Sequence, residues 1–243
     1  MKISELFYSI QGEGKRSGFP SFFIRTNHCN LRCKFPSGNL CDTPYTSWFP
    51  EDSQNLGEIS IEQIIDEYKK IFCRDIVISG GEPTIYSEEL KELCRKLKEI
   101  NPFSFITIET NGTFYGEFVK YADLISISPK LKSSVPFNTE YEKSHERNRI
   151  NKDVLKKFIS EKEKGKHDIQ LKFIFTSEDD ISEILNLQKE ISFKKEDIFL
   201  MTEGLTKEDL TLNREKTVEA CIKNGFNYTD RLHILVWGNK RGV

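Results

Sequence analysis

Short apolar runs alternate with longer amphipathic segments through most of this chain of 243 residues, and this alternation limits its fold more than any other feature. The apolar runs have the length of buried strands, and the segments between them space their apolar residues as one face of a helix. Strand and helix in regular turn are typical of a parallel sheet with helices outside it. We therefore expect one α/β domain, open or partly closed as a barrel, with about seven strands: 20–28, 75–83, 104–112, 122–130, 168–176, 196–201 and 227–237.

The intervening segments predict helices. A helix at 60–72 would begin with a capping box, in which Ser60 and Gln63 satisfy each other's backbone groups. The next helix, at 87–100, has Ser87 as its expected N-cap. Further helices are expected at 151–164, 177–191 and 206–225, and the stretch 133–149 is the least regular of the chain.

Charge and hydropathy exclude several partners. The 36 basic and 38 acidic side chains leave a net charge of −2, so no overall field attracts nucleic acid or an anionic membrane. No apolar run approaches the roughly 18 residues that span a bilayer, and the first residues hold no apolar core of a signal peptide. We therefore expect a cytoplasmic protein, in which clustered cysteines more often bind metal or do redox chemistry than form disulfides.

Three of the six cysteines lie in one polar loop, at 28–48, directly after the first expected strand: Cys29, Cys33 and Cys41. Three thiolates in such a loop fit an iron–sulfur cluster that keeps one iron open. A structural zinc ion usually takes four protein ligands, so it fits less well, and a disulfide plus a free thiol does not suit the compartment. The other cysteines lie in helical segments and are expected to be buried, inert thiols: Cys73, Cys94 and Cys221.

Polar motifs also follow the next three expected strands. SGGEP closes the second strand at 79–83, ETNG closes the third at 109–112, and SPK follows the fourth at 128–130. The carboxyl ends of parallel strands meet at one edge of a sheet, where such folds place their sites. We therefore expect these motifs to share one site with the cysteine loop.

The cysteine loop followed by GGEP resembles the radical S-adenosylmethionine (SAM) superfamily, in which a Cys-x3-Cys-x2-Cys motif holds a cluster and a Gly-Gly-Glu turn meets the SAM amino group. More specific motifs, spread from Met1 to the C-terminus, resemble its 7-carboxy-7-deazaguanine synthase family: FYSIQGEGKRSGFPSFFIRTNHCNLRC, CDTPYT, SGGEP, ETNG, SISPK and DRLHIL. The resemblance implies a partial (β/α) barrel of mostly parallel strands with helices outside, formed by residues 1–243 as a single radical SAM domain.

The sequence departs from the usual motif between its second and third cysteines. Seven residues separate Cys33 from Cys41 instead of two. We interpret the difference as an insertion within KFPSGNL, because a surface loop lengthens at little cost, and the CDT at the third cysteine supports Cys41 as a ligand. Leu40 stands where the family commonly has an aromatic residue over adenine, and Phe35 is the nearest aromatic side chain.

The resemblance implies that Cys29, Cys33 and Cys41 hold a [4Fe–4S] cluster whose open iron chelates SAM. One electron would then cleave SAM and yield a 5′-deoxyadenosyl radical. Glu82 is expected to accept a hydrogen bond from the SAM ammonium group, while its two preceding glycines let backbone approach SAM closely. The other expected SAM contacts are Leu40, Asp42, Gly80, Gly81, Glu109, Ser128, Lys130 and Gln170.

The implied substrate is 6-carboxy-5,6,7,8-tetrahydropterin. The radical would take hydrogen from C6, the ring would contract with loss of ammonia to 7-carboxy-7-deazaguanine, and SAM would be regenerated. Mg²⁺ would aid the rearrangement, with the hydroxyl of Thr43 as a ligand, and Arg25 would pair with the substrate carboxylate. The other expected substrate contacts are Ile10, Gln11, Gly12, Glu13, Ser79 and the terminal carboxylate of Val243, while His233 either faces the site or is a core histidine.

Two other function classes stay open at this point. One is a radical SAM activase that makes a glycyl radical on a protein partner, and the other is a non-catalytic zinc-binding module. The QGEG and CDT elements favour the deazaguanine-forming enzyme. The resemblance further implies an electron donor such as flavodoxin or ferredoxin and a homodimer, while the sequence leaves the pathway's end product, queuosine or archaeosine, undetermined.

Overall fold

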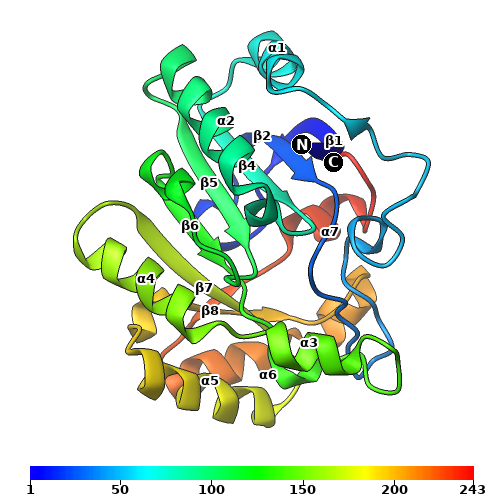
Figure 1. Cartoon of the computed structure of the whole chain (residues 1–243). Helices are drawn as coiled ribbons and strands as arrows, with labels where there is room; N and C mark the ends of the chain where they lie inside the picture. Colours follow the sequence, from blue (N-terminus) through cyan, green and yellow to red (C-terminus); the bar gives the residue numbers. More distant parts are fainter.

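A computed structural model describes all 243 residues, and one mixed sheet of nine strands runs through the whole chain (Figure 1). The strand order is β3-β1-β2-β4-β5-β6-β7-β8-β9. The strands are β1 (Lys2–Ile10), β2 (Pro20–Thr26), β3 (Gly57–Glu58), β4 (Asp75–Gly80), β5 (Phe105–Thr110), β6 (Leu124–Ile127), β7 (Asp168–Phe175), β8 (Ile198–Thr202) and β9 (Asn227–Thr229). Strand β1 is antiparallel to β2 and β3, whereas every pair from β2 to β9 is parallel.

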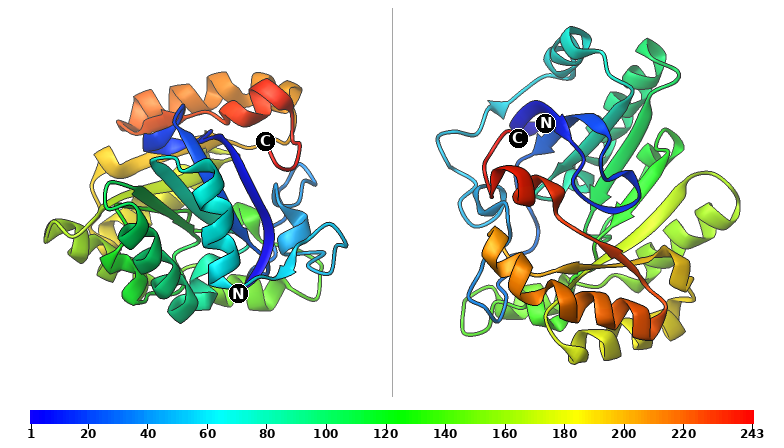
Figure 2. Two further views of the ribbon diagram at one scale, coloured as in Figure 1. Left: turned by 90° about the horizontal axis from the view of Figure 1, so that it is seen from above. Right: turned by 180° about the vertical axis from the view of Figure 1, so that it is seen from behind.

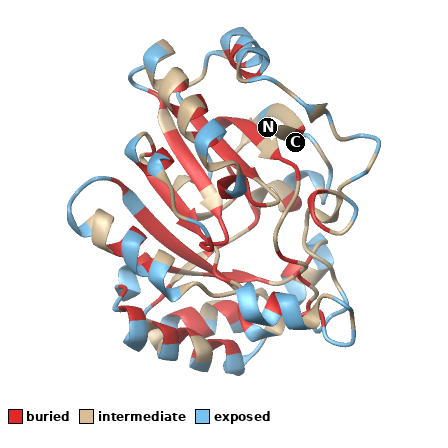
Figure 3. Ribbon diagram, in the orientation of Figure 1, coloured by how far each residue is buried: buried red, intermediate tan, exposed pale blue.

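The sheet curves into a partial barrel with helices on its outer side (Figure 2). The helices are α1 (Ile61–Ile71), α2 (Ser87–Ile100), α3 (Glu142–Asn148), α4 (Lys152–Glu163), α5 (Glu178–Ile191), α6 (Lys207–Asn224) and α7 (Leu232–Trp237). Figure 3 shows buried residues along the strands and on the helix faces turned toward them. One hydrophobic core of 37 buried residues joins sheet and helices, so the α/β barrel expectation is confirmed. None of the helices combines the length and apolar character that crossing a membrane requires.

The sheet has two strands more than the sequence suggested. Residues of β1 show no continuous apolar run, because much of this strand stays partly exposed. Its pairing with β2 sets Glu5 opposite Arg25, close to the carboxyl end of β2. The short strand β3 then pairs with the beginning of β1. These antiparallel strands form one edge of the sheet, next to the strand β2 that leads into the cysteine loop.

The expected last strand, 227–237, was wrong beyond its first residues. Strand β9 ends at Thr229, and Leu232–Trp237 form the helix α7. The apolar run LHILVW suits a strand, but only Ile234 of the helix is buried, and Trp237 is 44% exposed. The backbone N–H of Leu232 donates to the carbonyl of Gly12 at 3.0 Å, so a distant loop fixes where the helix begins. His233 therefore lies on a helix rather than on a strand.

Two local expectations also need correction, and one is confirmed. The stretch 133–149 is not irregular throughout, because it contains α3, whose His145 is buried. Helix α2 begins at Ser87 itself, with Tyr86 as its N-cap. The capping box of Ser60 and Gln63 at the start of α1 is confirmed.

Candidate active site

A cavity of about 410 Å³ lies where the carboxyl ends of the strands face the cysteine loop. All the residues expected at the site line this cavity except Glu82 and Gln170. They are Ile10, Gln11, Gly12, Glu13, Arg25, Cys29, Cys33, Leu40, Cys41, Asp42, Thr43, Ser79, Gly80, Gly81, Glu109, Ser128, Lys130 and Val243. His233 lines it as well. Segments from both ends of the chain therefore line one cavity, and its size is in the range of small-molecule sites.

The long gap between the second and third cysteines forms a closed hairpin. Lys34 and Leu40 pair as an antiparallel bridge, and the backbone N–H of Cys41 donates to the carbonyl of Cys33 at 3.2 Å. The side chains of Ser37 and Asn39, near the tip of the hairpin, donate to the carboxylate of Glu203 at 3.1 and 2.9 Å. The backbone of Cys41 therefore lies beside that of Cys33, although seven residues separate the two in the sequence.

The three thiols suit a cluster better than a single ion. All three line the cavity, and none forms a disulfide. No group of three or more Cys, His, Asp or Glu side chains in the chain is gathered closely enough to hold one metal ion. In an iron–sulfur cluster each cysteine binds its own iron, so the sulfurs need not converge on one point. Three cysteine thiols at one cavity are thus a donor set that a [4Fe–4S] cluster with one open iron can take, and its binding by Cys29, Cys33 and Cys41 stays a prediction.

Burial controls the protonation of these thiols. It raises the pKa of Cys29 to about 12 and that of Cys41 to about 11, and it raises the pKa of Cys33 as well. The positive charge of Lys130 acts on all three thiols in the opposite direction. The free thiols are thus protonated at neutral pH, and binding of a metal would release these protons.

The glycine turn after β4 packs directly against the chain that enters the cysteine loop. The N–H of Gly81 donates to the carbonyl of Thr26 at 3.1 Å, and the N–H of Glu82 donates to that of His28 at 2.8 Å. A Cβ atom on Gly81 would lie 2.0 Å from the carbonyl oxygen of His28. Gly80 also has a φ of +139°, which disfavours any other residue. The two glycines are therefore required for contact between this turn and the backbone before Cys29, in addition to any contact with SAM.

The buried side chain of Glu82 stabilises the same turn through hydrogen bonds. Its carboxylate accepts from the N–H and hydroxyl of Thr84, from the hydroxyl of Thr110 at 2.7 Å and from the N–H of Asn111 at 2.6 Å. Burial raises the pKa of Glu82, although these donors act to lower it. The side chain is fully buried and does not line the cavity. In this structure Glu82 ties the β4 turn to the end of β5, and its contact with SAM stays a prediction.

Gln170 likewise contacts the chain itself rather than the cavity. Its amide donates to the hydroxyl of Ser126 at 2.8 Å and accepts from the N–H of Lys15 at 2.7 Å. Only 2% of the residue is exposed. Gln170 thus links β6 to Lys15, directly after the QGEG loop at residues 11–14. Its expected contact with SAM is not supported by this structure.

A chain of paired charges forms one wall of the cavity. The ammonium group of Lys172 lies 2.6 Å from Glu13 and 3.3 Å from Glu109, and Glu13 also pairs with Arg231 at 3.4 Å. Arg231 forms a second ion pair with Asp42 of the cysteine loop. Burial opposes ionisation of Glu13, but Lys172 and Arg231 hold its pKa below the usual range. Burial acts to lower the pKa of Lys172, but Glu109 and Glu13 raise it above its usual value.

Sequence reasoning missed Lys172 and Arg231. Lys172 stands alone in the apolar run QLKFIF, and a lysine in a buried strand is rare unless it is paired. This signal could have identified it. Arg231 belongs to the quoted motif DRLHIL, but only the folded chain shows that it connects β9 to the cysteine loop.

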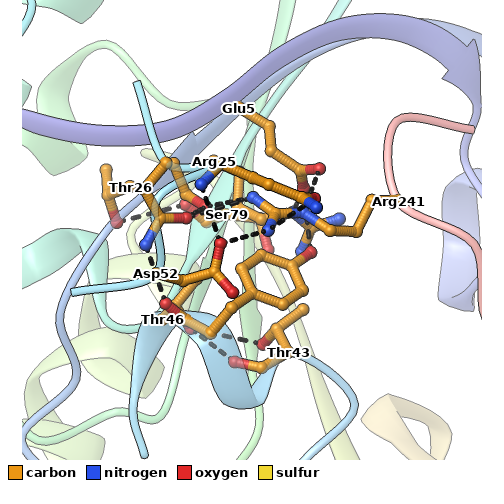
Figure 4. Close-up of polar contacts among 12 residues, drawn as sticks. Glu5, Arg25, Thr26, Thr43, Thr46, Asp52, Ser79 and Arg241 are labelled. Atoms are coloured by element: carbon orange, nitrogen blue, oxygen red, sulfur yellow. Dashed lines mark hydrogen bonds and ion pairs between the residues drawn. The ribbon is translucent and has the colours of Figure 1, made fainter. Parts of the chain in front are cut away.

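Arg25 also lines the cavity, and Glu5 orients its side chain (Figure 4). Its Nε donates to the Glu5 carboxylate at 2.8 Å, and the same carboxylate oxygen accepts from the hydroxyl of Tyr45 at 2.9 Å. Burial acts to lower the pKa of Arg25, but Tyr45 and Glu5 raise it above the usual value. Thr43 lies nearby, with its carbonyl accepting from the hydroxyl of Thr46 at 2.8 Å. The guanidinium group thus stays charged at the edge of the cavity.

Replacing Cys29, Cys33 or Cys41 singly by alanine should abolish the brown chromophore and the bound iron after anaerobic reconstitution, because each thiolate holds one iron. Iron and sulfide analysis checks this. The matched controls are alanine variants of Cys73 and Cys221, which lie outside the cavity and should keep full cluster content. Full cluster content in Cys41→Ala would show that the hairpin does not deliver the third ligand.

Gly81→Ala should lower cluster content while the chain still folds, because the added Cβ forces the β4 turn away from the backbone before Cys29. Iron analysis and circular dichroism measure the two effects separately. Gly165→Ala is the control, since it adds backbone strain at a φ of +71° but no steric clash, and Gly165 lies outside the cavity. A Gly81→Ala protein with normal iron content would contradict this role of the turn.

Comparison with known proteins identifies the family. Residues 23–187 match the radical SAM superfamily. The 7-carboxy-7-deazaguanine synthase of Halobacterium salinarum is 36% identical over 98% of this chain and 91% of its own length. That of Rhodopirellula baltica is 35% identical over 99% of this chain and 88% of its own length. The crystal structure of QueE from Escherichia coli shares the fold, with a TM-score of 0.67 at 22% identity, over 96% of this chain and 94% of that one. The chain belongs to the radical SAM superfamily and, within it, to the 7-carboxy-7-deazaguanine synthase family.

Proposed function

We propose that this chain converts 6-carboxy-5,6,7,8-tetrahydropterin into 7-carboxy-7-deazaguanine with loss of ammonia, as a radical SAM lyase. The observation that carries the proposal is that one cavity of about 410 Å³ joins the cysteine loop to a wall of fixed, paired charges. Such a wall suits a small polar heterocycle. The QGEG and CDT motifs favour this reading over an activase that acts on a protein partner, and a zinc module would have no use for the charged wall.

The cysteine side of the cavity is the proposed site of the cluster and of SAM. When bound, the cluster and SAM supply the radical that removes hydrogen from C6 of the substrate. Lys130, whose ammonium group donates to the hydroxyl of Ser128 at 2.9 Å, provides a positive charge close to the thiols and to the SAM carboxylate. Glu109 accepts from the hydroxyl of Ser79 at 2.7 Å and is the proposed partner of the SAM ribose. Leu40 and Phe35 both line the cavity and would cover adenine.

The opposite side is the proposed substrate site. Glu5 engages only the Nε atom of Arg25, so the two Nη atoms are available for a bidentate pair with the substrate carboxylate. The loop from Ile10 to Gly12 and the side chain of Gln11 line the cavity and offer backbone and amide groups to the edge of the pterin. Glu13 stays ionised beside Lys172, so it can accept from the N–H groups of the aminopyrimidine.

The setting of the reaction follows from its chemistry. We propose a reducing cytoplasm, because all six cysteines are free thiols. A low-potential donor such as flavodoxin or ferredoxin would supply the electron, and Mg²⁺ would bind at Thr43. The homodimer and the place in queuosine or archaeosine synthesis remain predictions from the family resemblance.

Anaerobic incubation of the reconstituted protein with SAM, a reductant and the tetrahydropterin tests the proposal. We expect a product with the mass and absorbance of 7-carboxy-7-deazaguanine, and one equivalent of ammonia, while SAM is not consumed. Iron and sulfide analysis of the same sample separates a failed reconstitution from a wrong substrate. A protein with a full cluster that cleaves SAM yet leaves the pterin unchanged would contradict the assignment.

Thr43→Ala should lose the Mg²⁺ stimulation of turnover and still cleave SAM reductively, because the hydroxyl is proposed to bind the metal and not SAM. Turnover measured over a range of Mg²⁺ concentrations checks this. The control is Thr211→Ala, which removes an exposed threonine hydroxyl on α6. Undiminished Mg²⁺ dependence in Thr43→Ala would remove Thr43 from the metal site.

Two glycines appended after Val243 should weaken substrate binding, because Val243 lines the cavity and its carboxylate can accept paired N–H donors from the substrate. Loss of one charge-assisted pair costs about 1.5–3 kcal/mol, or roughly ten- to a hundredfold in affinity. Substrate KM and SAM cleavage are measured separately. An unchanged KM in the extended chain would show that this carboxylate does not contact substrate.

A further inference from the structure

Arg241 holds the segment after α7, residues 238–243, against two other parts of the chain (Figure 4). Its Nε donates to Glu5 of β1 at 3.0 Å. One Nη donates to Asp52 at 3.2 Å, and the other donates to Asn55 at 3.1 Å. The guanidinium carbon also lies 3.8 Å from the centre of the Tyr45 ring. One side chain thus joins the C-terminal segment to β1 and to the segment that follows the cysteine loop.

The same Glu5 carboxylate orients Arg25. One of its oxygens accepts from Arg241, and the other accepts from both Arg25 and Tyr45. Two guanidinium groups therefore share one carboxylate, and Asp52 supplies the second negative charge. Four residues of the C-terminal segment line the cavity that Arg25 also lines: Asn239, Lys240, Arg241 and Val243. Movement of Arg241 would disturb the position of Glu5 and, with it, that of Arg25.

This cluster differs from an ordinary surface ion pair, which contributes little to stability. The side chains of Arg241 and Glu5 are only 23% and 11% exposed. All three guanidinium nitrogens of Arg241 donate hydrogen bonds, and its guanidinium carbon lies over the Tyr45 ring. A lysine offers one point charge instead of a planar fork, so it cannot contact all these acceptors from one position.

We propose that Arg241 is a positioning residue for substrate binding, which latches the segment 238–243 across the cavity and, through Glu5, fixes the guanidinium group of Arg25. This inference rests on the proposed function in one respect, the role of Arg25 toward the substrate carboxylate. The latch itself is a property of the folded chain and is tested without turnover.

Hydrogen–deuterium exchange of the reconstituted protein tests the latch. In Arg241→Gln the amides of Gly238 and Lys240, the two hydrogen-bonded amides of residues 238–243, should exchange faster than in the unchanged protein, while those of the central strands keep their protection. Arg95→Gln is the matched control, because Arg95 also pairs with two carboxylates but lies on the outer surface of α2. Unchanged exchange of 238–243 in Arg241→Gln would overturn the latch, whatever the substrate is.

Steady-state kinetics with the tetrahydropterin test the positioning role. Arg241→Gln should raise substrate KM by about tenfold, as for the loss of one charge-assisted hydrogen bond, with kcat and SAM cleavage close to normal. Arg241→Lys should restore little of the loss, and Asp52→Asn, which leaves Arg25 untouched, should raise KM less. A normal KM combined with faster exchange would overturn the positioning role and leave only a structural latch.

A double variant tests whether the effect passes through Glu5. If it does, adding Arg241→Gln to Glu5→Gln should change KM less than Arg241→Gln changes it alone. Fully additive effects would overturn the route through Glu5. If the unchanged protein does not turn over the pterin, the proposed function fails, and the exchange measurement still decides the latch.

Discussion

The cavity depends on the pairing of buried charges. Lys172 and Arg231 are almost fully buried, and each is compensated by two carboxylates that come from other parts of the chain. Glu13 is common to both pairs, so the QGEG loop, β7 and the region after β9 are fixed together. Removal of one partner from such a pair typically costs about 3–5 kcal/mol, because it leaves the other charge buried and unpaired. The charged wall of the cavity is consequently held in place by these ion pairs, with charges whose signs are set before any ligand binds.

The cysteine side is built by backbone contacts rather than by charges. The hydrogen bond from Cys41 to Cys33 returns the chain after the hairpin, and the turn at Gly80 and Gly81 packs on the backbone that leads to Cys29. The second contact needs close approach of main-chain atoms, which explains why glycines occupy the turn. A lengthened loop can therefore present three thiols to the same space as a short one.

The sequence was sufficient for features that depend on neighbouring residues, and it was insufficient for those that depend on distant ones. The strand and glycine turn at 75–83 and the capping box of α1 follow from local patterns, and both are present. Helix α7 was taken for a strand because LHILVW is apolar and β-branched, whereas the loop at Gly12 determines its conformation. The lone lysine in the apolar run QLKFIF marks Lys172 as a buried, paired charge. Its partners, like those of Arg231 and Arg241, lie dozens to hundreds of residues away, so only the folded chain identifies them.

Deuterium transfer from C6 of the tetrahydropterin into SAM measures most directly whether one cavity holds both molecules in contact. The reconstituted protein is incubated anaerobically with substrate labelled at C6, and SAM is then recovered for mass spectrometry. If SAM binds beside the cysteine loop and the tetrahydropterin binds in the same cavity, as proposed, deuterium appears in SAM as the product accumulates. Product that forms without any label in the recovered SAM would contradict the shared cavity as the place where hydrogen is removed.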